Sequence, residues 1–217
     1  MKSYLPQLPP VPGAENYVPL GRSILDVLSD EHRFLDAMCA GVRDEPSRDA
    51  ASILVAVLCR HLSAERQYLY PTVAKAVGAA LADERLMADD ELLAAADALL
   101  RAEPATAAWR EALTALRVGA AGHRHYCEQN VFSALRAVLS PADLVRLGNR
   151  AEMALESAPS RPHPGAPRRT PWNKVTDPML GAIDKVRDLF TGRSTYPPPA
   201  QESGRRRVRT HHPITQS

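Results

Sequence analysis

A histidine and a glutamate stand four residues apart within the stretch 59–71, at His61 and Glu65. In an α-helix this spacing separates the two side chains by about 40° around the axis and about 6 Å along it. An imidazole and a carboxylate on one inward face can chelate a single cation. As an exposed pair they would instead contribute only about 0.2–0.5 kcal/mol to the helix. The apolar residues on both sides of the pair favour metal binding.

Other polar groups lie on apolar helical stripes as His61 does. His32 is followed by apolar residues at +3, +6, +7 and +10, and Asp89 has apolar residues at the same four offsets. Asp90 fits this pattern less well, because a charged residue stands at its +7 position. His123 precedes a pair of large apolar or aromatic residues by eight and nine positions, as His61 does. Each of four helices would thus offer an inward polar group at a comparable depth, which is how helical bundles build metal sites.

Five helices are predicted to position these groups, from apolar periodicity and from start and stop signals. Ser23, Ser47 and Ser140 are the expected N-caps, and Pro71 is expected to kink the second helix. Long helices joined by short loops favour an all-α fold, an up-down-up-down four-helix bundle with an additional C-terminal helix. The predicted helices cover about 23–44, 47–78, 83–101, 106–139 and 140–156.

Composition divides the chain of 217 residues into three parts. Residues 1–21 contain five prolines and predict an extended arm, and residues 22–158 hold the helical bundle. Residues 159–217 predict a flexible Pro/Arg-rich tail with a short amphipathic helix near 179–190.

Charge separates the bundle from the tail. Residues 1–160 contain 16 Lys/Arg and 21 Asp/Glu, a net charge of −5, whereas residues 161–217 contain 11 and 4, a net charge of +7. The simpler expectation is a solvated, solubilising tail. The alternative is electrostatic docking, on the chain's own acidic bundle or on an acidic partner, with no specific nucleic acid predicted.

Several classes of protein are disfavoured. No apolar run approaches the length of a bilayer span, and the N-terminal residues lack the apolar segment of a signal peptide. Cys39, Cys59 and Cys127 are an odd number of cysteines at long spacing, which disfavours a disulfide scaffold or a zinc ribbon. The expected location is therefore the cytoplasm.

The inward polar residues resemble those of the hemerythrin-like, or HHE cation-binding, domains. The resemblance covers about residues 22–158, and the segments at 161–164 and 173–188 resemble an extension of some bacterial members. In that family, histidines and carboxylates from four helices hold a non-haem di-iron centre that takes oxygen or small oxidants as ligands. The matching motifs are Asp30-Glu31-His32 with Leu35, His61-x-x-x-Glu65 leading into Leu69-Tyr70-Pro71, and His123 with Glu128 and Val131-Phe132.

The resemblance implies imidazole ligands at His32, His61 and His123 and a bridging or terminal carboxylate at Glu65. Two positions depart from the family pattern. Asp89 or Asp90 stands where the third helix should offer a histidine, and Cys127 stands where a carboxylate is expected four residues after His123. Glu128, five residues after His123, remains a candidate because hemerythrins use a carboxylate at that spacing. The predicted metal ligands are His32, His61, Glu65, Asp89, His123 and Glu128.

The predicted function is non-haem iron binding, with one ion or an oxo-bridged pair. The role would be to sense or handle oxygen, peroxide or nitric oxide, or to take part in iron homeostasis. Carboxylate-rich ligation suits Fe(III) or manganese, and a Cys127 thiolate would favour zinc, so these metals are alternatives. The competing hypothesis is a metal-free helical interaction module with a decayed cation site. An enzyme that turns over peroxide is a third hypothesis.

Overall fold

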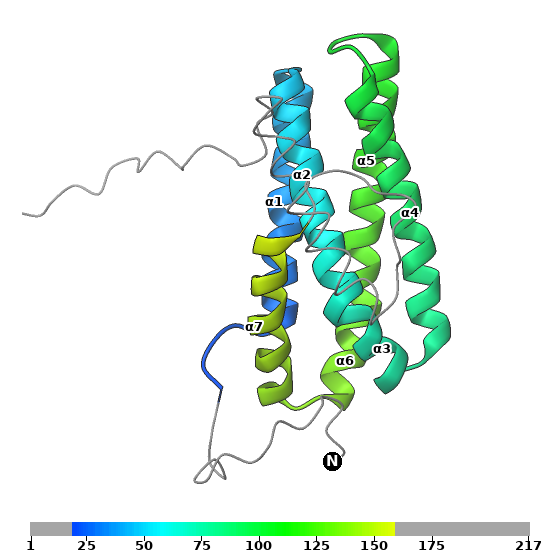
Figure 1. The fold of residues 1–217 in the computed structure, drawn as a ribbon. Helices are drawn as coiled ribbons and strands as arrows, with labels where there is room; N and C mark the ends of the chain where they lie inside the picture. The colour runs from blue at the N-terminus through cyan, green and yellow to red at the C-terminus, as the bar shows by residue number, and fades with distance from the viewer. Residues whose placement is uncertain (1–18, 159–217) are drawn as a thin grey trace, which may run out of the picture.

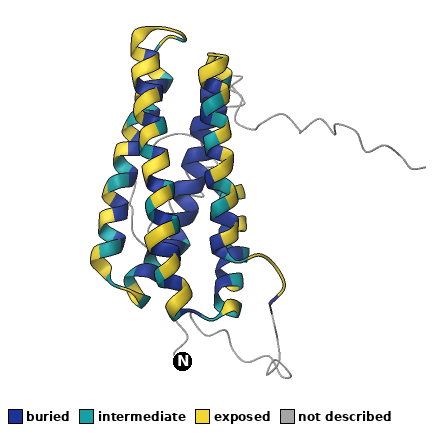
Figure 2. Ribbon diagram, turned by 180° about the vertical axis from the view of Figure 1, so that it is seen from behind, coloured by how far each residue is buried: buried dark blue, intermediate teal, exposed yellow. Residues whose placement is uncertain are grey.

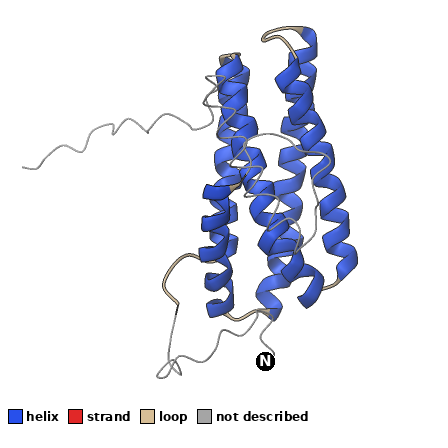
Figure 3. Ribbon diagram, in the orientation of Figure 1, coloured by secondary structure: helices blue, strands red, loops and turns tan. Residues whose placement is uncertain are grey.

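The structure is a computed structural model that describes residues 19–158, and these residues form helices and no strand (Figures 1 and 3). The prediction of an all-helical fold is confirmed. The predicted N-terminal arm up to residue 18, the basic tail and the helix near 179–190 lie outside the described residues. The elements are α1 (Ile24–Asp44), α2 (Arg48–Ala64), η2 (Glu65–Leu69), α3 (Tyr70–Ala76), α4 (Ala79–Arg101), α5 (Ala107–Tyr126), η3 (Cys127–Val131), α6 (Phe132–Val138) and α7 (Pro141–Ser157).

Side-chain caps fix where most of these helices begin. Ser23, Ser47 and Ser140 each accept a hydrogen bond from the backbone N–H three residues on, at 3.1–3.2 Å, as the sequence predicts. Thr106 caps α5 in the same way, accepting from the N–H of Trp109 at 3.2 Å. Each cap satisfies a backbone donor that the first helical turn leaves without a partner.

The third predicted helix begins earlier than expected. The sequence predicts a start near residue 83, whereas α4 begins at Ala79. The extra turn places Ala82 in the core with 3% exposure and packs Leu81 against it. Burial of these apolar side chains therefore favours an earlier start of the helix than the sequence predicts.

Helices α2, η2 and α3 follow one another as one continuous rod, and so do α5, η3 and α6 (Figure 1). Helix α1 packs against α2, α5 and α7, and α4 packs against α2, α3 and α5. Buried residues line the inner faces of these rods and exposed residues line the outer faces (Figure 2). Among the described helices, none combines the length and the apolar character needed to cross a membrane.

Two separate apolar clusters form the core. The first is built from α1, α2, α4 and α5 and includes Leu54, Leu99 and Trp109. The second includes Leu28 and Phe132 and is completed by apolar residues of α7. In α1 and α4, the residues of the second cluster precede those of the first cluster in the sequence. In the α2–α3 and α5–α6 rods, the residues of the first cluster come earlier in the sequence. A polar layer lies between the two clusters, and each long rod contributes to it.

Helix α7 lies close to the start of α1. A Cβ atom built on Gly148 would lie 2.0 Å from the carbonyl oxygen of Arg22 and 2.9 Å from the backbone nitrogen of Ile24. Such distances are shorter than any real contact, so only glycine fits here. This close approach lets α7 cover the second apolar cluster.

Each of the two long composite rods contains one π-helical turn. In the first, the N–H of Tyr70 donates to the carbonyl of Glu65, and in the second the N–H of Phe132 donates to the carbonyl of Cys127. The first turn ends two residues before Pro71, where the sequence predicts a kink. The second has no proline near it, and the sequence does not predict it. Both π turns begin four residues after an inward histidine, beside the polar layer.

Candidate metal centre

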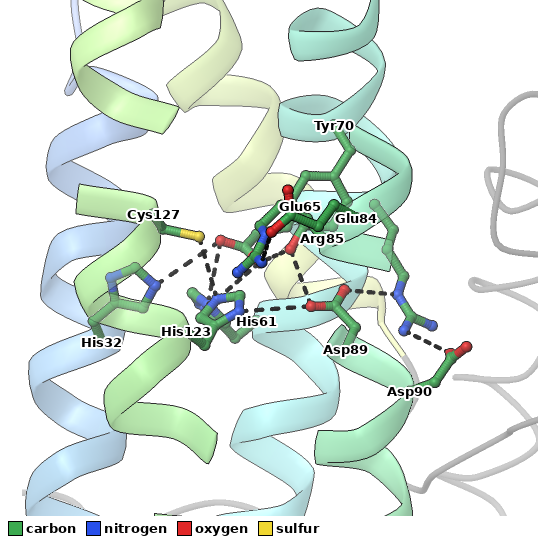
Figure 4. Close-up of polar contacts among 11 residues, drawn as sticks. His32, His61, Glu65, Tyr70, Glu84, Arg85, Asp89, Asp90, His123 and Cys127 are labelled. Atoms are coloured by element: carbon green, nitrogen blue, oxygen red, sulfur yellow. Dashed lines mark hydrogen bonds and ion pairs between the residues drawn. The ribbon is translucent and has the colours of Figure 1, made fainter. Parts of the chain in front are cut away.

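Four buried side chains from three rods converge in the polar layer (Figure 4). His32 comes from α1, His61 from α2, Glu65 from the first π turn and His123 from α5. One ligand atom from each lies within 4.8 Å of the others, and none of the four residues is more than 5% exposed. These four are the residues that could together hold a metal ion.

The distances between the donor atoms suit a single small cation. The Nε2 atoms of His61 and His123 are 3.3 Å apart. Glu65 Oε1 lies 3.5 Å from Nε2 of His61 and 3.9 Å from Nε2 of His32, and Glu65 Oε2 lies 3.1 Å from Nε2 of His123. Two donors at about 2.0–2.1 Å from a tetrahedral ion would themselves be about 3.3 Å apart. The observed spacings are close to that value.

Several donor atoms at this centre have no hydrogen-bond partner. His32 Nε2 and Glu65 Oε1 are buried and unpartnered, and so are the Nδ1 atoms of His61 and His123. Buried polar atoms nearly always have a partner, because leaving one unsatisfied costs about 1–3 kcal/mol. A cation between His32 Nε2 and Glu65 Oε1 would satisfy both atoms. The residues present therefore fit a bound metal ion.

Burial keeps two of the imidazoles neutral. It lowers the pKa of His61 to about 3, although the nearby carboxylate of Glu65 acts in the opposite direction. The pKa of His32 is also lowered, again chiefly because the ring is buried. Neutral imidazole is the form that coordinates a metal, so these two rings need not lose a proton to bind one.

Glu65 and His123 form a charged pair at the centre. Burial alone would raise the pKa of Glu65, but His123 and the other two histidines bring that pKa below its usual value. Burial alone would lower the pKa of His123, but Glu65 and Cys127 raise it well above its usual value. The carboxylate is therefore ionised and ready to bind a cation, which would take the place of the proton on His123.

Asp89 is buried beside the centre and has partners of its own. The residue has no exposed surface, whereas the Asp90 side chain is 32% exposed. Arg66 Nε donates to Asp89 Oδ2 at 3.1 Å, and the Tyr70 hydroxyl lies 3.1 Å from Asp89 Oδ1. Burial raises the pKa of Asp89 to about 6, while Arg66 acts to lower it. Asp89 is thus the inward residue of α4, but it lies outside the convergent group.

Glu128 and Cys127 flank the centre on the second π turn. Glu128 Oε1 lies 3.1 Å from Nδ1 of His32, the ring nitrogen on the side away from Glu65. The Cys127 thiol is completely buried, and its Sγ lies 3.7 Å from Nε2 of His123. Burial raises the pKa of Cys127 to about 11, so the thiol stays protonated beside the histidine. Of the six predicted ligands, the structure brings together four and places Asp89 and Glu128 around them.

Tyr70 and Arg66 hold carboxylates at the centre and beside it. The Tyr70 hydroxyl donates to Glu65 Oε2 at 2.7 Å; the sequence favours packing roles for Tyr68 and Tyr70 but leaves open a hydrogen bond from one of them to a metal centre. Arg66 pairs with Asp89 and, through Nη2 at 3.4 Å, with Asp90. In a straight α-helix Tyr70 would lie about 180° from His61, and the π turn reduces this to about 80°. Regular helical periodicity therefore does not place Tyr70 on the face of His61, and the sequence does not single out Arg66.

Comparisons with known proteins agree with this geometry. The family model described as hemerythrin HHE cation binding domain matches residues 23–135, which extend from α1 into α6 and include all four convergent donors. Neither the curated proteins nor the solved structures compared with the chain gave a match. Together with the buried histidine and glutamate group, the family match indicates a metal-binding site. The chain belongs to the hemerythrin HHE cation-binding domain family.

Proposed function

We propose that this protein binds non-haem iron through His32, His61, Glu65 and His123 and uses it to sense or handle a small oxidant. Oxygen, peroxide and nitric oxide are the ligand class, and iron homeostasis is the alternative role. The observation that carries the proposal is the set of convergent, buried donor atoms that lack a hydrogen-bond partner, led by His32 Nε2 and Glu65 Oε1.

The donor set is compatible with iron. Three imidazoles and one carboxylate suit iron, with manganese and zinc as alternatives. Iron bound by these donors would supply coordination positions beyond the four protein ligands, where a small oxidant can bind and exchange electrons. The Cys127 sulfur is not among the four convergent donors, so this donor set lacks the sulfur ligand that would favour zinc.

The surrounding residues hold the donors in place. The Tyr70 hydroxyl donates to Glu65 Oε2, which also lies 3.1 Å from Nε2 of His123, while Oε1 lies near His61 and His32. Glu128 contacts Nδ1 of His32, which leaves Nε2 of that ring for coordination. Partners of this kind fix ring orientation and tautomer in metal sites, so we assign Glu128 and Asp89 supporting roles beside the ligands.

We also propose that the helices form an up-down-up-down bundle in the cytoplasm. The reversal of the two apolar clusters between successive rods supports this topology. For the tail, the opposite net charges of residues 1–160 and 161–217 support docking on the bundle or on an acidic partner.

Metal analysis after anaerobic loading with Fe(II) tests the proposal. The wild-type chain should retain iron after desalting, and His61→Ala should lose it, because His61 supplies a central donor. His125→Ala is the matched control, since His125 is exposed on the same helical rod as His123. A wild-type chain that retains no iron, or a His61→Ala variant that binds it as well as the control does, would support the metal-free interaction module instead.

Peroxide consumption separates iron storage from redox handling. Glu65→Gln should slow consumption by the iron-loaded protein, because the variant loses the anionic ligand but keeps its size. Glu152→Gln, at an exposed position on α7, should have no effect. Equal rates for the two variants would argue against a redox role for the centre.

A further inference from the structure

We propose that this chain binds one metal ion and not two, because an internal ion pair between Arg66 and Asp89 takes the place of a second ion. The inference rests on the proposed function and specifies the stoichiometry of the same site. Two features carry it: the commitment of Asp89 to other partners, and the shortage of further donors.

The carboxylate of Asp89 is already satisfied by the protein. One oxygen accepts from Arg66 Nε at 3.1 Å, and the other lies 3.1 Å from the Tyr70 hydroxyl and 3.6 Å from Nδ1 of His123. The side chain is fully buried, so water cannot compensate for the loss of any of these contacts. To coordinate an ion, Asp89 would have to break its pair with Arg66.

Arg66 provides a permanent positive charge at this position. Its side chain is only 12% exposed and pairs with both Asp89 and Asp90, which Figure 4 shows. Arg66 Nε lies 3.1 Å from Asp89 Oδ2, and Arg66 Nη2 lies 3.4 Å from Asp90 Oδ1. A guanidinium cannot be deprotonated in a protein. A second dication near Asp89 would therefore meet a fixed like charge in a poorly solvated region.

The remaining donors are too few for a second ion. Within residues 19–158, His32, His61, Glu65 and His123 are the one group of three or more donors that could hold a metal. The second oxygen of Glu65 accepts from Tyr70 at 2.7 Å, and Glu128 contacts the outer nitrogen of His32 at 3.1 Å. Once the first ion is bound, no comparable set of donors is left in the described part of the chain.

Arg66 and Tyr70 are therefore positioning residues with a shared effect. Arg66 balances the charge of Asp89, and Tyr70 links Asp89 to Glu65 through its hydroxyl. Together they hold both carboxylates so that Glu65 lies near all three imidazoles, whereas Asp89 lies near Nδ1 of His123. The arrangement selects a mononuclear centre with three histidines and one glutamate.

Iron stoichiometry in the full chain tests the inference directly. After anaerobic loading with Fe(II) and desalting, the wild-type protein should contain one iron per chain. After oxidation it should give the EPR signal of an isolated high-spin ferric ion. Two irons per chain, with an EPR-silent pair and near-ultraviolet oxo-bridge absorption, would overturn the inference but leave iron binding intact. No iron at all would overturn the proposed function and, with it, this inference.

Variants at Arg66 and Asp89 test the cause. Arg66→Gln removes the fixed charge and should permit a second iron, whereas Arg66→Lys keeps the charge and should retain one. If Arg66→Gln folds and still binds only one iron, Arg66 does not limit the stoichiometry. Because Arg66→Gln leaves a buried carboxylate unpaired and can unfold, Asp89→Asn provides an independent test. It should keep one iron, since Asp89 is not a ligand, and loss of that iron would overturn the assignment.

Discussion

The Tyr70 hydroxyl offers the most direct test of how the polar layer is held together. Tyr70→Phe removes one oxygen and leaves the ring, which is 2% exposed and packed in the second apolar cluster. The lost hydroxyl donates to the ionised Glu65 at 2.7 Å and lies 3.1 Å from Asp89. The substitution therefore deprives two buried carboxylates of a contact without creating a large cavity.

The expected cost follows from the charge of the acceptor. A hydrogen bond to a charged group contributes about 1.5–3 kcal/mol, and a buried carboxylate cannot recover it from water. We expect Tyr70→Phe to lower the free energy of unfolding of the metal-free protein by about 1.5–3 kcal/mol. For a helical domain of this size, that loss corresponds to a decrease in Tm of about 3–12 °C.

Chemical and thermal unfolding followed by far-ultraviolet circular dichroism would measure this loss. The matched control is Tyr126→Phe, which removes a hydroxyl that contacts Glu84 at 3.3 Å in an exposed setting but keeps the ring beside Arg85. The control should change the free energy of unfolding by no more than about 0.5 kcal/mol. If the two variants lose the same stability, the Tyr70 hydroxyl does not support Glu65 and the reasoning fails.

Further predictions concern packing, titration and metal affinity. Gly148→Ala should lower the free energy of unfolding by about 1–3 kcal/mol, because the new Cβ would collide with the Arg22 carbonyl. Gly122→Ala, the control at an open helical position, should raise the free energy of unfolding by about 0.5–1 kcal/mol. Burial raises the pKa of Cys39 from 9.0 to about 11, so the folded chain binds this proton more tightly than the unfolded chain. Wild type should therefore lose more stability than Cys39→Ala as the pH rises from about 9 through about 11, and equal losses would contradict the assignment. Glu128→Ala should weaken iron binding by about 10–100-fold without abolishing it, measured by competition with a chelator, and complete loss would instead make Glu128 a ligand.

Regular helical periodicity predicts most of the framework of the site. The serine caps, the five helical segments and the inward positions of His32, His61, Glu65 and His123 all follow from local signals and apolar spacing. These features are local, because a cap or a stripe is determined by residues within one or two turns. Asp89, and not Asp90, is also the buried residue of its pair, as the apolar offsets predict.

The partners of the site are less accessible to sequence reasoning. Arg66 stands next to Glu65 in the sequence, but its pairing with Asp89 joins residues 23 positions apart on different helices. Glu128 and His32 are 96 positions apart. Such pairings depend on how the rods pack against one another, and no local pattern encodes that. For Tyr70 the sequence leaves open a hydrogen bond to a metal centre, but regular periodicity does not place this residue on the inner face, because the π turn changes the face to which it belongs.

The two π turns also determine how the chain tolerates changes in length. Each turn holds one residue more than an α-helix would need, so deletion of a residue within Glu65–Leu69 or Cys127–Val131 could restore a regular helix. Residues after the deletion would keep their orientation relative to the preceding histidine, because eight residues of regular α-helix turn through the same angle, about 80°, as nine residues that include a π turn. Tyr70 or Phe132 would therefore stay on the inner face with His61 or His123. A loss of one residue at these points, other than Glu65 itself, would thus leave the ligands and their supporting side chains on the same face.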